Sequence, residues 1–177
     1  MSKSNFLEVF KSDQNIFENI QSVNSNLNEF LGSVWNDLSV LVSKYIDFLT
    51  QARIDKGLMI AYTELSQAIM MNPDKWAKMQ AQFYQDFFKI WMNFWERQFG
   101  KEVEDVIKPS PKDSRFRAKE WKQNPYFDFI KESYLLLSDF MMNVLNEFPL
   151  EEHKRKKLYF HTRQFVSSIS PTNFAIS

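Results

Sequence analysis

The chain has 177 residues, 22 basic and 22 acidic side chains, and 44% hydrophobic residues, a composition typical of a globular protein rather than a disordered one. Its three glycines stand apart, at positions 32, 57 and 100, which excludes a glycine-rich phosphate-binding loop and argues against a sheet protein with many tight turns. Cysteine is absent, which excludes a thiolate zinc site and a cysteine nucleophile in this chain. The only histidines are His153 and His161, so too few histidines are present for a catalytic triad or a multi-histidine metal site. We therefore expect no catalytic residue, no metal ion and no cofactor in this chain.

Charge is distributed unevenly along the chain. Residues 1–50 carry 3 basic and 6 acidic groups, a net charge of −3, whereas residues 151–177 carry 5 and 2, a net charge of +3. The basic run at residues 153–157 is interpreted as a solvated helix face, because a nucleic-acid-binding protein would present a much more basic surface. No signal peptide is visible and no apolar run has the length of a membrane span. These features predict a cytoplasmic protein with no nucleic-acid partner and no membrane span.

The first predicted element is a long amphipathic helix. Between residues 16 and 52 apolar side chains recur at steps of three and four, which places them in one stripe along a helix. Ser12 or Asp13 is suited to cap its start, and Gly57 is expected to end it.

Two further helices are predicted before residue 100. The second covers residues 58–71, and Asn72 followed by Pro73 ends it because the residue before a proline avoids the helical conformation. The same dipeptide begins a third helix over residues 73–99, with Asn72 as N-cap and Gly100 as the residue after its C-terminal end.

The second half of the chain has the same helical character. A polar stretch with two prolines is interpreted as a linker over residues 101–112. Asn124 and the proline after it begin a fourth helix that extends to Phe148, and a fifth is expected from Pro149 to Ser170. No segment alternates with a period of two residues, so the predicted fold class is all-α. Three regions are expected: an extended hairpin or bundle of long helices over residues 1–100, the linker, and a compact helical element over residues 113–177.

Tryptophans in the long helices have two interpretations. Aromatic stripes at helical spacing usually pack in a core or between helices. Helices this long, with few other elements to cover them, also favour a partly exposed stripe that contacts an apolar surface or a partner helix. On the second interpretation the candidate partner surface consists of Trp35, Trp76, Trp91 and Trp95.

One string of residues is more distinctive than the rest. Asp113 and Arg115 can pair or cap, Phe116 and Trp121 can anchor an irregular stretch on a core, and the Asn-Pro dipeptide then begins a helix. The candidate structural or interdomain residues are Asp113, Arg115, Phe116, Trp121, Asn124, Pro125 and Tyr134.

This string resembles the N-terminal region of class I polyhydroxyalkanoate synthases, which polymerise hydroxyacyl-coenzyme A thioesters such as those of poly-3-hydroxybutyrate. The resemblance continues through a basic segment at residues 155–157, Gln-Phe-Val at 164–166 and Ser-Pro-Thr-Asn-Phe at 170–174, whereas residues 1–100 match only loosely. It implies an all-α, non-catalytic N-terminal domain of such an acyltransferase. The abrupt end at residue 177 fits a fragment that stops before the α/β-hydrolase domain, where the family carries its cysteine nucleophile.

Partners follow from the resemblance as expectations. It implies contact with the synthase catalytic domain, a homodimer, and a granule-associated location through the polymer granule surface or granule-associated proteins. The alternative is a free-standing helical scaffold that resembles a phasin or a synthase-partner subunit and acts by adsorption alone. A plain coiled-coil dimerisation module is a weaker alternative, because a coiled coil needs no segment like the one that begins at Asp113.

Overall fold

A computed structural model describes residues 56–174 together with seven positions nearer the N-terminus, namely 29, 36, 39, 40, 43, 44 and 47. The chain divides into two compact units, Met1–Gln51 and Ala52–Ser177. In the first unit the seven described residues are helical, and Trp35 lies outside the described residues. The second unit contains α2 (Lys56–Met70), α3 (Pro73–Gln98), α4 (Glu120–Gln123), α5 (Pro125–Glu147), α6 (Glu152–Ser168) and two short 3-10 helices, η1 (Ser114–Phe116) and η2 (Pro171–Asn173). The described residues form no strand, and the all-α prediction is confirmed.

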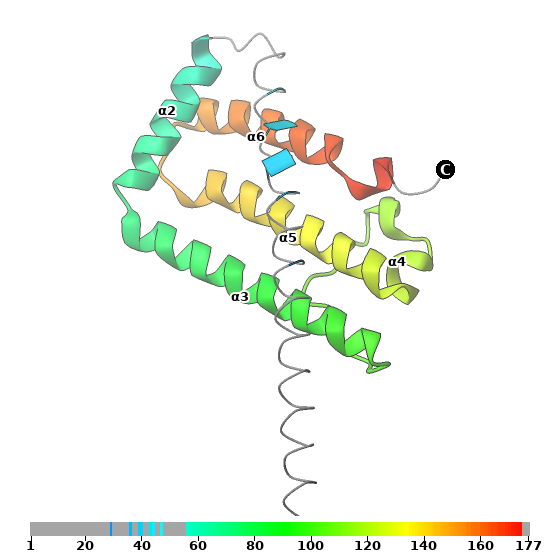
Figure 1. Cartoon of the computed structure of the whole chain (residues 1–177). Coiled ribbons are helices and arrows are strands. Elements are labelled where there is room, and N and C mark those ends of the chain that lie inside the picture. Colours follow the sequence, from blue (N-terminus) through cyan, green and yellow to red (C-terminus); the bar gives the residue numbers. More distant parts are fainter. Residues whose placement is uncertain are drawn as a thin grey trace, which may run out of the picture. The chain divides into compact units, whose positions relative to one another are not determined.

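In the second unit α5 is the central helix. Figure 1 shows it between α3 and α6, with α2 crossing one end of the layer and linking its two outer helices. The segment before α5 doubles back so that α4 packs on the start of that helix, and η2 contacts it after α6. Helices on both sides of the predicted linker therefore share one core.

Helix boundaries follow local sequence signals. Gly100 has a φ of 77°, and the amides of Gly100 and the residue after it donate to the carbonyls of Arg97 and Glu96, which closes α3 with a Schellman motif. Asn72 stands at the N-cap position of α3, but its side-chain amide donates back to the carbonyl of Ala68 instead of capping. Gly57, expected as a stop, lies inside the first turn of α2. A glycine near a helix start is tolerated because the first backbone N–H groups have no partner within the helix.

The last boundary also differs from its prediction. Residue 148 has an extended backbone, and α6 begins at Glu152 rather than at Pro149. Phe148 is buried to 1% exposure, so the short connection between α5 and α6 is held by its side chain.

The core lies where α2 meets the ends of α5 and α6. Leu58, Ala61 and Leu65 of α2 pack with Leu145 of α5 and Leu158 of α6, and all are buried. Each fully buried leucine stabilises the fold by roughly 1.5–3 kcal/mol relative to its exposed state. A second cluster of buried residues lies toward the other end of α5 and consists of Phe116, Trp121, Tyr134 and Val166.

Candidate functional site

Phe116, Trp121 and Tyr134 of the distinctive string belong to the second cluster. The polar residues of the string begin at Asp113. This carboxylate caps η1 by accepting the backbone N–H of Arg115 at 3.1 Å, and it also accepts from Nε and Nη2 of the Arg115 guanidinium at 2.9 and 2.8 Å. The hydrogen bonds from Arg115 lower the pKa of Asp113, and the same carboxylate raises the pKa of the guanidinium. The two side chains therefore form a charged pair that is fixed in place by a helix cap.

The pair continues into the helix layer through Tyr134. Nη1 of Arg115 donates to the hydroxyl oxygen of Tyr134 at 2.9 Å, and this hydroxyl donates to the carbonyl of Val166 on α6 at 2.9 Å. Tyr134 and Val166 are both buried. A single chain of hydrogen bonds thus joins η1, α5 and α6.

The aromatic part of the string packs beneath this chain. The ring of Phe116 lies edge-on to Trp121, with 5.1 Å between centroids, and 5.9 Å from the ring of Tyr134. Trp121 is only 3% exposed, and the centroid of its ring lies 5.6 Å from that of Phe127. The arrangement buries two large rings in a stretch that has little regular structure of its own.

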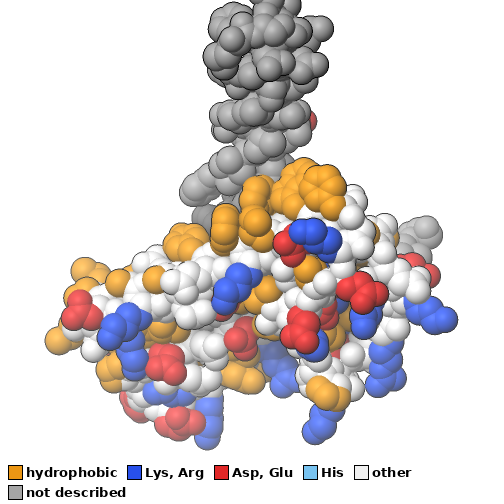
Figure 2. Space-filling view, turned by 90° about the horizontal axis from the view of Figure 1, so that it is seen from below, with side chains coloured by type: hydrophobic (Ala, Val, Ile, Leu, Met, Phe, Trp, Pro, Cys, Tyr) orange, Lys and Arg blue, Asp and Glu red, His pale blue; other side chains and the backbone are white. Residues whose placement is uncertain are grey.

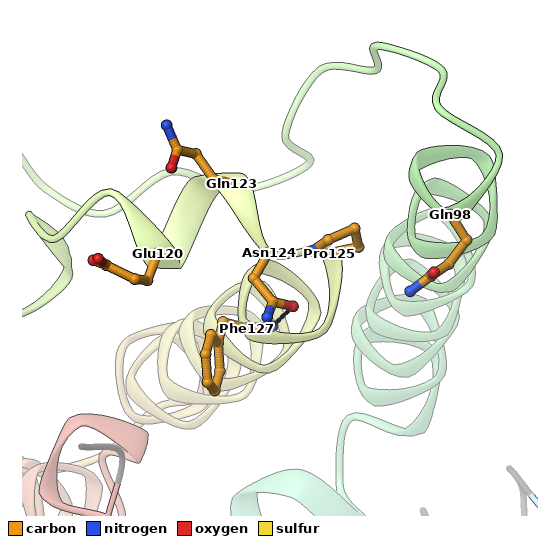
Figure 3. Close-up of a pocket in the computed structure, with 6 residues that line it drawn as sticks. All are labelled: Gln98, Glu120, Gln123, Asn124, Pro125 and Phe127. Atoms are coloured by element: carbon orange, nitrogen blue, oxygen red, sulfur yellow. Dashed lines mark hydrogen bonds between the residues drawn. The ribbon is translucent and has the colours of Figure 1, made fainter. Parts of the chain in front are cut away.

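Asn124 and Pro125 begin α5 as the sequence predicted. The Asn124 side-chain oxygen accepts the backbone N–H groups of Tyr126 and Phe127 at 2.9 and 3.4 Å, while Pro125 occupies the first helical position. Figure 3 shows this turn together with an open depression of about 470 Å³, lined also by Gln98, Glu120 and Gln123. Its lining offers amides and one carboxylate, which can bind a ligand by hydrogen bonds but do not pair a nucleophile with a base.

A buried ionic cluster lies beside the string, and the sequence did not predict it. Arg97 at the end of α3 donates to Asp105 at 2.9 Å, to Glu132 at 3.1 Å, and to Asp128. Lys131 also donates to Asp128 and, through the same amine, to the carbonyl of Trp121 at 3.3 Å. Asp128 and Glu132 are 1% and 0% exposed, so these charges lie away from solvent.

The cluster also fixes the segment expected to be a linker. Backbone N–H groups of Val106 and Ile107 donate to Glu132 Oε2 at 2.6 and 3.1 Å, and Asp105 contributes its side chain. Burial raises the pKa of Glu132 against the opposing effect of the Ile107 N–H and Arg97. Three carboxylates face two cations here, and the negative charge of Asp128 raises the pKa of Glu132 in the same direction as burial.

Three carboxylates of this cluster lie close enough together to be considered as a metal site. Oxygens of Asp105, Asp128 and Glu132 come within 4.8 Å of one another. Arg97 and Lys131 already bind those carboxylates, so the arrangement is that of an ionic network and not of an open cation site.

The candidate tryptophans that are described all lie on α3 and are half-buried. Trp76 packs against the first core cluster, with its ring 5.8 Å from Phe140 and 6.3 Å from Phe148. Trp91 and Trp95 stand edge to face, 6.1 Å apart, toward the other end of the helix. The core and surface interpretations thus each have a structural basis.

These contacts define an all-α element in which a capped, charged pair and two buried rings are fixed onto a helix layer. Residues 112–177 match the family described as the poly-beta-hydroxybutyrate polymerase (PhaC) N-terminus. Residues 112–177 therefore match the N-terminal domain of polyhydroxyalkanoate synthases, as the string of residues indicated.

Curated relatives agree with this assignment. The chain is 34% identical over 116 residues to a poly(3-hydroxyalkanoate) polymerase of Methylorubrum extorquens, a match that covers 65% of this chain and 19% of the relative. It is 33% identical over 113 residues to poly(3-hydroxyalkanoate) polymerase subunit PhaC of Rhizobium meliloti, covering 63% and 18%. The protein of the same name in Rhizobium etli is 30% identical over 134 residues, covering 71% and 21%. The chain thus spans about a fifth of the length of these relatives, and no solved structure matches.

Among the helices that the structure describes, none combines the length and the apolar character needed to cross a bilayer.

Proposed function

We propose that this chain acts as the non-catalytic N-terminal domain of a class I polyhydroxyalkanoate synthase, an acyltransferase that polymerises hydroxyacyl-coenzyme A. In this role it supports the catalytic domain, takes part in a homodimer, and contacts the polymer granule or granule-associated proteins in the cytoplasm. The observation that carries the proposal is the packed string within the matched residues: Asp113, Arg115 and Tyr134 form one hydrogen-bonded chain above the buried rings of Phe116 and Trp121.

The physical basis of support is rigidity. A docking surface binds better when its side chains are already ordered, because less conformational entropy is lost on association. Here Asp113 orders Arg115, and α5 and α6 hold Tyr134 from two sides. A catalytic domain that meets this element therefore contacts a surface whose shape is set in advance.

A chimera tests the proposal. The segment of the Methylorubrum extorquens polymerase that matches this chain is replaced by residues 56–177, and coenzyme A release and polymer accumulation are measured. We expect the chimera to exceed the same polymerase lacking the segment. A Trp121→Ala chimera should lose that gain, whereas Tyr126→Ala, at a 57% exposed side chain, should keep it. A chimera no more active than the truncated enzyme would contradict the proposal.

A second candidate function is a free-standing, phasin-like scaffold or synthase-partner subunit that adsorbs to granules. It is favoured by large aromatic side chains on the outside of α3, where Tyr84 and Phe88 are 63% and 59% exposed. The test is adsorption of the purified chain to polyester particles when no polymerase is present. Tight adsorption together with a failed chimera would favour the scaffold over the synthase domain.

A further inference from the structure

Helix α3 has a second apolar face in addition to the one that packs on α5. The α5-facing side includes the buried Ile90 and the ring of Phe83, which lies 4.9 Å from Phe140. The second face, which we call the outer seam, repeats at steps of three or four residues, as a helix–helix contact does. Its members are Ala77, Ala81, Tyr84, Phe88, Met92, Trp95 and Phe99. In Figure 2, which views the unit from the side where α3 lies in Figure 1, hydrophobic side chains reach the surface among charged ones.

Side-chain size changes systematically along the outer seam. Its first members are alanines, at 77 and 81, whereas its last are Trp95 and the 78% exposed Phe99. Phe88 stands midway, eleven residues from either end of the seam. If a second α3 lies antiparallel on the first with Phe88 opposite its own copy, Ala77 faces Phe99 and Ala81 faces Trp95. Small residues then receive large ones, which is the condition for close packing between helices.

Charge along the edge of the outer seam has the same symmetry. Lys78 and Glu96 lie eighteen residues apart, five whole helical turns, so both stand on the same edge. In an antiparallel pair equivalent edges meet, which brings Lys78 of each copy to Glu96 of the other. A parallel two-fold pair would instead place the two copies of this edge on opposite sides of the interface, where Lys78 and Glu96 do not meet. The carboxylate of Glu96 forms an ion pair with the solvent-exposed Lys101 at 3.7 Å, which is a weak pair that can be exchanged.

We propose that this chain forms a dimer in which α3 of one copy pairs antiparallel with α3 of a second copy through the outer seam. The proposal rests on the proposed function for the presence of a homodimer and adds the surface that forms it. Tyr84, Phe88 and Phe99 expose 63%, 59% and 78% of their area, and aromatic side chains of about 200 Å² each give about 800 Å² over the two copies. With the alanines, Met92 and Trp95 included, the total approaches the roughly 1,200 Å² of a stable interface.

Cross-linking tests the arrangement directly, because the chain has no cysteine and each introduced one is unique. Phe88→Cys should cross-link to its own copy with a short thiol reagent. Ala77→Cys should not, since its two copies lie about 33 Å apart along the antiparallel helices. A mixture of Ala77→Cys with Phe99→Cys should cross-link between the two variants. Self-cross-linking of Ala77→Cys would indicate parallel helices and overturn the proposal.

The oligomeric state supplies the second test. Light scattering of the whole chain should give a dimer, and Phe88→Glu should give a monomer because its two copies would meet at the centre of the outer seam. Phe160→Glu is the matched control, since Phe160 on α6 is equally exposed at 59% and should leave the dimer intact. Lys78→Glu should weaken the dimer at least tenfold, and Glu96→Lys added to it should restore the affinity. A wild-type monomer, or a dimer unaffected by Phe88→Glu, would overturn the pairing. The chimera measures activity and light scattering measures the oligomeric state, so the two proposals can fail separately. An active chimera together with a monomeric chain would contradict only the α3 pairing. An inactive chimera together with a dimeric chain would contradict only the synthase role.

Discussion

Removal of the Trp121 side chain is the most direct test of the string as a folded element. The indole is 3% exposed and lies 5.1 Å from the ring of Phe116 and 5.6 Å from that of Phe127. The carbonyl of the same residue accepts a hydrogen bond from Lys131, and an alanine keeps that bond. Trp121→Ala therefore isolates the packing contribution. We expect it to lower the free energy of unfolding by about 3–5 kcal/mol, of which each ring pair accounts for about 0.5–1.5 kcal/mol.

The measurement is urea and thermal unfolding of the whole chain, followed by far-ultraviolet circular dichroism because five tryptophans would mix their fluorescence. A loss of this size should lower the thermal midpoint by about 2–8 °C for each kcal/mol. Trp121→Phe should recover part of the loss. Tyr126→Ala, at an exposed position in the first turn of α5, should change the stability by less than about 0.5 kcal/mol. A midpoint for Trp121→Ala equal to that of the wild type would refute the reasoning and mark the indole as a docking residue.

Three further predictions concern the polar groups around the string. Tyr134→Phe leaves the buried carbonyl of Val166 without its donor and should cost about 1–3 kcal/mol in urea unfolding, with the far-ultraviolet spectrum unchanged. Because the native pKa of Asp113 is lowered, its contribution to stability is present above its ordinary pKa of about 4 and is lost as pH falls through the native value. The stability difference between wild type and Asp113→Asn should therefore shrink from pH 6 to pH 3, and a constant difference would contradict this. Arg97→Ala leaves three carboxylates facing one lysine and should lower the free energy of unfolding by about 3–5 kcal/mol. The double variant Arg97→Ala with Glu132→Gln should lose less stability than the sum of the losses in the two single variants.

Local signals made most of the helix layer predictable. The Asn-Pro dipeptide before α5 caps and starts the helix at the residue expected, and Gly100 ends α3 in the left-handed conformation that glycine alone adopts readily. Both signals depend on residues within one helical turn, so they can be recognised in the sequence without knowledge of tertiary contacts. Gly57 was wrong as a stop because a lone glycine also fits a first helical turn. Pro149 was wrong as a start because the burial of Phe148 fixes the chain in an extended conformation there.

The candidate site was predictable in part. Trp121 and Phe116 were expected to anchor the irregular segment, and both are buried together. The ionic cluster was not predicted, because its members come from α3, the segment after it and α5. The one available signal was the spacing of Asp128, Lys131 and Glu132, which places three charges on one face beside an apolar stripe. Such charges are usually solvated, and only the arrival of Arg97 from another helix turns them into a network.

The ionic cluster also decides where the folded element begins. The predicted boundaries place a compact element at residues 113–177, after a linker at 101–112. Yet Glu132 is held by Arg97 and by the N–H groups of Val106 and Ile107, all of which lie before that boundary. In a fragment of residues 112–177, the carboxylates of Asp128 and Glu132 would lack these partners. The fragment would also lack α2 and α3, which pack in the core. We expect it to unfold at low urea without a cooperative transition, whereas residues 56–177 should unfold cooperatively. A cooperative transition of equal midpoint in the shorter fragment would show that the element begins at residue 112 and that α3 only rests against it.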